Sequence, residues 1–178
     1  MSRFAAWRRR RAGSLLRDER GVAAIEFSLM AVLVFTMLAA AVDMTQALII
    51  QRDINRFTAA AAMVLATADD DTKVALAGLE INAKIANVLP GWTGVEVGSA
   101  SVVRDGAAIR VGVGTMTYMP PEANAAALAA LADKDHGVVV RASYRHEPII
   151  LGFAERFGLT TRTFVATTAA LRLRNAQY

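Results

Sequence analysis

Residues 19–30 read ERGVAAIEFSLM, and they open the longest apolar run of the chain. Charged residues end just before Gly21, and the apolar run begins at Val22. Up to residue 42 this run contains a single charged residue, Glu26. A helix needs about 20 mainly apolar residues to cross a bilayer. The stretch therefore predicts a membrane-spanning helix over residues 22–42 that carries an acid about one turn from its start.

The helical pattern continues beyond the apolar run, without Pro or Gly. Apolar residues recur in steps of three and four at Ala47, Ile50, Ile54, Phe57, Ala61, Val64 and Ala68. This spacing places them on one face of a helix, while polar residues occupy the other faces. We therefore expect one continuous helix over residues 22–68. Its amphipathic second half is expected to pack on the protein's own globular part, and docking of a partner helix is the alternative.

A run of three Asp residues at 69–71 interrupts this pattern. Asp71 or Thr72 can accept hydrogen bonds from the first free amides of a second helix, which is expected over residues 72–89. Pro90-Gly91 is expected to end that helix. A calcium loop needs ligands spread over about a dozen residues and a final bidentate Glu, so we interpret the Asp run as a solvated cap.

The rest of the chain has the period of two that is typical of strands. Strands are predicted at 95–103, 109–118, 138–144 and 164–173, with a turn at Asp105-Gly106 and a short helix at 122–133. The last strand is expected to point Val165, Thr167, Ala169, Leu171 and Leu173 inward. Residues 148–159 are expected to form an apolar loop or short helix. The predicted fold class is α+β: a long N-terminal helix followed by a small antiparallel sheet with short helices.

The basic charge of the chain is concentrated at its start. Residues 1–21 contain seven Arg and two acidic residues, Asp18 and Glu19, so their net charge is +5. The remainder holds 13 basic and 14 acidic residues, so its net charge is −1, and the total is +4. A near-neutral body argues against nucleic-acid binding, which needs clustered Lys and Arg. A basic leader before an apolar span instead predicts a cytoplasmic N-terminus. The expected organisation is a leader (1–21), the helix (22–68) and an extracytoplasmic domain (69–178).

Catalysis finds little support in the sequence. His136 and His146 are the two histidines, and neither belongs to a metal-binding pattern such as HExxH. Ser143, His146 and Glu147 are close in sequence, but a strand points successive side chains in opposite directions. The VGVG at 111–114 lacks the third Gly of a dinucleotide-binding loop, and the chain has no Cys. We expect no enzyme activity, no cofactor and no metal.

The acid at position 26 admits two interpretations. In the first, Glu26 lies close enough to the membrane surface to be tolerated as an interfacial acid. In the second, a peptidase cuts between Gly21 and Val22, so that Val22 becomes a free ammonium at the end of a bare apolar helix. An unpaired charge is costly in such surroundings. The Glu26 carboxylate of a neighbouring subunit, shifted along the helix axis, can neutralise this ammonium.

This arrangement of a basic leader, Gly21, four small or apolar residues, Glu26-Phe27 and an apolar helix resembles the class III signal of type IV pilins and pseudopilins. The longer stretch from LLRDERGVAAIEFSLM to INRFTAAAA resembles the TadE/TadG-like family of Flp (tight-adherence) pilus assembly proteins, and FVATTAALRLRN near the C-terminus is also similar to that family. The chain length is similar to that of a short TadE-type pseudopilin.

The resemblance implies a cleavage site for prepilin peptidase at Gly21/Val22 and an assembly site at Glu26 and Phe27. It also implies a single-pass protein of the bacterial inner membrane with its C-terminal domain in the periplasm. The implied partners are the peptidase, other pilin and pseudopilin subunits, the Flp assembly platform and membrane lipid. Two alternatives stay open: an uncleaved membrane-anchored binding domain of the platform, and an exported soluble protein cleaved after Ala41.

Overall fold

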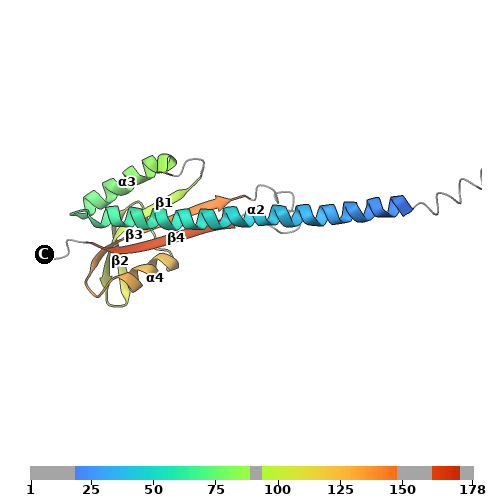
Figure 1. Ribbon diagram of the computed structural model, residues 1–178. Coiled ribbons are helices and arrows are strands. Elements are labelled where there is room, and N and C mark those ends of the chain that lie inside the picture. The colour runs from blue at the N-terminus through green and yellow to red at the C-terminus, as the bar shows by residue number, and fades with distance from the viewer. Residues whose placement is uncertain (1–18, 89–93, 148–161, 173–178) are drawn as a thin grey trace, which may run out of the picture.

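The computed structural model describes residues 19–88, 94–147 and 162–172. It has the predicted α+β fold, in which a long helix lies along a small antiparallel sheet (Figure 1). The elements are α2 (Glu19–Ala66), α3 (Asp71–Val88), β1 (Glu96–Asp105), β2 (Ala108–Gly114), α4 (Pro121–Ala130), β3 (His136–His146) and β4 (Arg162–Leu171). The predicted segment at 148–159 and the Pro90-Gly91 helix end lie outside the described residues.

Helix α2 has 48 residues and a length of about 72 Å at 1.5 Å per residue. Its second half lies on the sheet, and its first half projects beyond the other described elements (Figure 1). Among the described residues the helix begins at Glu19, before Gly21, and it ends at Ala66 rather than at residue 68. The amides of Thr67 and Ala68 donate to carbonyls three residues earlier, at 3.3 and 3.1 Å, which tightens the last turn.

The four strands have the order β2-β1-β3-β4, and every neighbouring pair is antiparallel. The β1–β2 turn falls at the predicted Asp105-Gly106, where Gly106 has a φ of 61°. The prediction that the second strand reaches Tyr118 is wrong, because β2 ends at Gly114. Beyond that point the amides of Thr115 and Met116 both donate to the Ser99 carbonyl, at 2.8 and 3.0 Å, and the chain leaves the regular ladder.

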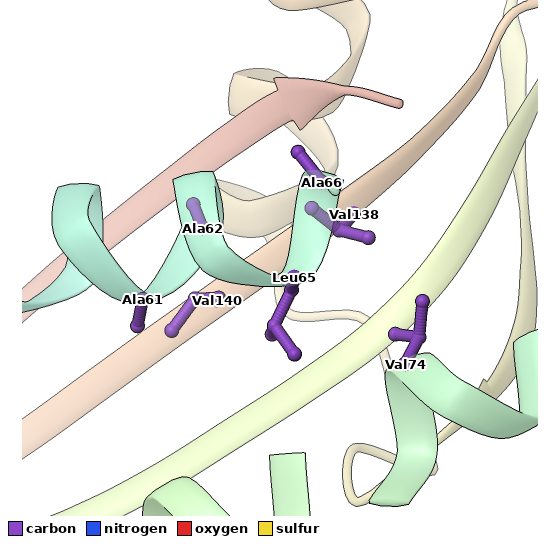
Figure 2. Packing of buried hydrophobic residues seen from close by; sticks show 7 residues of the cluster. All are labelled: Ala61, Ala62, Leu65, Ala66, Val74, Val138 and Val140. Carbon is purple, nitrogen blue, oxygen red and sulfur yellow. The ribbon is translucent and has the colours of Figure 1, made fainter. Parts of the chain in front are cut away.

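Helices cover both faces of the sheet. On one face, Leu65 of α2 and Val74 of α3 are fully buried against Val138 and Val140 of β3 (Figure 2). On the other face, Val139 packs with Ala123, Ala127 and Leu131 from α4 and its end. The core is therefore formed by two layers of contacts, one on each side of β3.

This two-sided core corrects the prediction for the last strand. Ala166 and Ala170 of β4 pack on the α2 side, whereas Ala169 packs on the α4 side. The predicted inward residue Leu171 is 44% exposed. A one-sided alternation fails because each face of β4 has its own helix to contact.

The buried face of α2 also departs from the predicted one near its end. Ile50, Ile54, Phe57 and Ala61 are buried as expected, but Val64 is 59% exposed and its neighbour Leu65 is fully buried. Steps of three and four average 3.5 residues, whereas a straight α-helix has 3.6 per turn, so the two patterns drift apart by about 20° per heptad. Over the two heptads from Ile50 to Val64 the drift is about 40°, which turns Val64 toward the edge of the buried face.

The start of α3 lies one residue earlier than predicted, and a different Asp caps it. The Asp70 carboxylate accepts from the Lys73 amide at 2.7 Å. Asp71, one of the two residues expected to cap the helix, instead binds Arg172 with an Nη1–Oδ1 distance of 2.6 Å. Arg172 also donates to the Ala68 carbonyl at 3.2 Å. This arginine therefore joins the end of β4 to the turn between α2 and α3.

Truncation of Ile54 tests whether α2 depends on the sheet for its stability. Ile54 is fully buried against Ala142 and Ala166, so Ile54→Ala is expected to lower the free energy of unfolding by about 2–5 kcal/mol. Met63→Ala is the matched control, because Met63 lies on the same helix but is 69% exposed. Chemical denaturation of the detergent-solubilised protein measures both. Equal losses in the two variants would contradict the packing described above.

Candidate functional site

The predicted site residues Gly21, Val22, Glu26 and Phe27 lie together on the first turns of α2, far from the sheet (Figure 1). Val22 is 57% exposed and Phe27 is 76% exposed, and Glu26 is exposed as well. Residues four apart lie on the same side of a helix, so Glu26 is one turn above Val22 on one face. The site is thus a charged position on an otherwise apolar surface.

The Gly21–Val22 peptide bond lies inside the helix, because α2 already includes Glu19 and Arg20. Cleavage at this bond requires the first turn to open. Glycine lowers helix stability by about 1 kcal/mol relative to alanine, and helix ends without tertiary contacts open at little cost. A Cβ atom built on Gly21 would meet no other atom within 4 Å. Within the described part of the chain, no atom lies close to Gly21 beyond the helix's own turn.

The hydroxyl groups of the apolar half are satisfied within the helix. Ser28 and Thr36 donate to the carbonyls of Ala24 and Val32, both at 2.7 Å. Thr45 makes the same kind of bond to a carbonyl four residues earlier, at 2.8 Å. Because these groups need no water, they add little to the cost of placing the helix in an apolar environment. Glu26 is left as the residue whose charge has to be compensated there.

The first half of α2 is long and apolar enough to cross a membrane. In its most apolar window only 6% of the residues are buried, whereas the core helix of a soluble domain would be mostly buried. Most of its large apolar side chains are more than half exposed: Ile25, Leu29, Met30, Val32, Leu33, Val34, Phe35, Met37 and Leu38. A signal sequence near the N-terminus satisfies the same criteria of length and apolar composition, so this geometry is compatible with a membrane anchor and with an export signal.

The exposed apolar surface extends further than the predicted span of 22–42. Met44, Leu48 and Ile49 are 67%, 63% and 52% exposed, while Asp43 between the two stretches is buried. From Val22 to Ile49 the helix rises about 40 Å, which exceeds the roughly 30 Å of a bilayer core. In a bilayer, a helix with this surface would tilt strongly or bury part of the surface against other apolar side chains.

Sequence reasoning missed this extension because it followed the face that packs on the sheet. Met44 and Leu48 lie on the far side of α2 from the buried Ile50, and Ile49 lies about a quarter turn from Ile50. The spacing of four residues between Met44 and Leu48 indicates a second apolar face. We refer to the exposed part of α2 from Val22 to Ile49 as the stalk.

The residues considered for catalysis do not come together. His136 and His146 lie at opposite ends of β3. His146 is buried between the rings of Tyr144 and Phe164, at centroid distances of 6.2 and 6.1 Å, whereas the Ser143 hydroxyl lies 3.4 Å from the Glu96 carboxylate. Within the described ranges, no group of three or more His, Cys, Asp or Glu residues could hold a metal ion.

A comparison of the chain with protein families, with curated proteins and with solved structures found no match in any of the three.

Proposed function

We propose that this protein is a minor, TadE-like pseudopilin that takes part in the assembly of an Flp-type (tight-adherence) pilus. The observation that carries the proposal is the stalk: a largely exposed apolar helix half that projects beyond the other described elements, with Glu26 one turn after Gly21-Val22. A surface of this size is stable only in lipid or against other apolar helices. Pilin-like assembly supplies both environments, one after the other.

In this proposal the chain enters the inner membrane with its arginine-rich leader in the cytoplasm and its sheet in the periplasm. Prepilin peptidase cleaves between Gly21 and Val22 and removes the leader with its net charge of +5. The new ammonium at Val22 then pairs with Glu26 of a neighbouring subunit as the stalks pack together. The protein acts as a substrate of the peptidase and as a binding partner of pilin subunits and the assembly platform, without catalysis of its own.

The helical start of α2 favours one alternative. Because Glu19, Arg20 and Gly21 already belong to the helix, the bond at Gly21/Val22 is less accessible than a bond in an extended segment. The chain would then stay full-length, as a single-pass, membrane-anchored binding domain of the secretion or pilus platform. Both functions use the same stalk, and they differ in the N-terminus of the mature protein.

The mature N-terminus decides between these functions. We expect the protein purified from peptidase-competent cells to begin at Val22, and the protein from cells without prepilin peptidase to begin at residue 1. Intact-mass spectrometry of the membrane fraction measures the difference. Full-length chains in both strains would support the uncleaved anchor, and a chain that begins at Val42 in the soluble fraction would show an exported protein.

A further inference from the structure

A shallow recess of about 290 Å³ lies on the face of the sheet that carries α4, next to the first turn of that helix. Val102 and Val139 contact α4 on this face. Gly98 lies on β1 an even number of residues from Val102, and Arg141 lies on β3 an even number of residues from Val139. Side chains at even spacings point to the same face of a sheet. Gly98 and Arg141 are also paired across the two strands, so both belong to the α4 face. Helix α4 thus covers one part of the face and leaves the recess beside it.

The walls of the recess are held in place by hydrogen bonds outside the regular ladder. Thr115 is fixed to β1 in both directions: its amide donates to the Ser99 carbonyl at 2.8 Å, and its hydroxyl accepts from the Ser99 amide at 2.9 Å. The following residues, including Thr117 and Tyr118, form one wall. Gly98 contributes no side chain, and Met116 lies over it, with side-chain atoms 3.3–3.6 Å from where a Cβ atom would be. The recess is therefore formed before any ligand binds.

The polar groups in and beside the recess are also oriented. The Nε–H group of Arg141 donates to Glu122 at 3.0 Å, and the remaining guanidinium N–H groups are further donors. The pKa of the Glu122 carboxyl is lowered by a hydrogen bond from its own backbone amide and then by Arg141, so this carboxylate stays ionised. Glu96 lies 3.4 Å from the Ser143 hydroxyl. One positive and two negative side chains thus share a small area.

We propose that this recess binds one sugar ring of a neutral glycan. The two carboxylates disfavour an anion, Arg141 disfavours a cation, and an apolar ligand would cover these charged groups without replacing their bonds to water. Sugar hydroxyls both donate and accept, which matches the guanidinium, carboxylate and threonine groups. Tyr118 is 70% exposed and offers an aromatic face for the C–H side of the ring.

The size of the recess supports a single ring. Sites for drug-sized ligands begin at roughly 300 Å³, and this recess is at that lower limit. The ligand would bind on the extracytoplasmic side of the stalk, on a face that α2 does not cover. The site is independent of the pilin-like function proposed above, because it uses neither the leader nor the stalk.

Titration with defined glycans tests the site. The full-length protein in detergent micelles is titrated with chitotriose and with maltotriose, and the amide shift of Gly98 is followed by NMR. We expect a saturable shift with at least one of them, and at least tenfold weaker binding by Tyr118→Ala. Tyr118→Phe should keep most of the affinity because it keeps the ring. Leu79→Ala, at an exposed position of α3, is the matched control and should bind normally.

Three results would overturn the proposal: no saturable shift with either glycan, equal binding by the Tyr118→Ala and Leu79→Ala variants, or a stronger response to inorganic phosphate or spermidine. The last result would assign the recess to a charged ligand. Because the readout is local to Gly98, it gives the same answer whether or not the leader is removed, so its failure is separate from a failure of the pilin-like function.

Discussion

Gly21→Leu is expected to abolish removal of the leader, so that all of the protein in peptidase-competent cells keeps its first 21 residues. The proposed peptidase has to accommodate the residue before the cut without a side chain. The protein itself tolerates the change, because a Cβ atom at position 21 would contact nothing within 4 Å. A leucine also strengthens the helix at this turn relative to glycine, by roughly 1 kcal/mol. Intact-mass spectrometry of the membrane fraction measures the effect.

Gly21→Ala separates the two contributions to this block. Alanine stabilises the helical turn about as much as leucine does, but its side chain is a single methyl group. If Gly21→Ala is processed faster than Gly21→Leu, the size of the side chain in the peptidase pocket causes the block. If both variants are blocked alike, the block is caused by the more stable helical turn or by the presence of any Cβ atom at position 21. Ser28→Ala, which lies in the same helix beyond the site, is the control and should be processed normally. Efficient removal of the leader from Gly21→Leu would contradict the proposed cleavage site.

The architecture could be predicted because its signals are local and strong. The absence of Gly and Pro across residues 22–68 and the steps of three and four at Ile50, Ile54 and Phe57 indicate a single amphipathic helix. The Asp105-Gly106 pair between alternating apolar residues indicates a hairpin turn. These features depend on neighbours within a few positions, and the structure contains both of them.

The errors concern features that depend on distant residues. Tyr118 continues an alternating pattern, yet the strand stops at Gly114 because Ser99 of the neighbouring strand binds the next two amides. Leu171 fits a buried position of an isolated strand, yet helices on both faces of the sheet leave it 44% exposed. The sequence does not reveal the recess beside Tyr118, because the alternating pattern predicts a regular strand up to that residue. A regular strand would not form the wall of the recess.

The candidate assembly site was predictable as a pattern but not as a surface. The order of residues in the sequence identifies Gly21, Val22, Glu26 and Phe27, and in the structure they lie on an exposed part of α2. The continuation of that exposed surface to Leu48 and Ile49 became visible only when the buried face of α2 was known. An apolar stalk of about 40 Å, longer than a bilayer core of roughly 30 Å, is the structural argument for neighbouring helices.

Pairing between Val22 and a neighbour's Glu26 predicts a specific shift between stalks. Each residue would lie opposite the neighbour's residue four positions later, about 6 Å along the axis. The chain has no Cys, so Leu29→Cys in one tagged copy and Leu33→Cys in another should form a disulfide when the two are expressed together. Both positions are more than half exposed and lie on the face of Val22. Non-reducing electrophoresis of membranes and sheared fibres detects the mixed dimer.

Glu26→Ala should reduce this mixed dimer and the assembled material at least roughly tenfold, because an ammonium left without its partner in an apolar bundle is strongly unfavourable. Membrane insertion and cleavage should stay intact, which intact mass confirms in the same samples. Copies that both carry Leu29→Cys are the control for register: they report stalks aligned without a shift and should cross-link weakly. Two results would contradict the pairing: a mixed dimer that is undiminished in Glu26→Ala, or a preference for the unshifted pair. Either would show that the stalks pack through apolar contacts alone. Glu26 would then pair within its own chain or with the membrane surface.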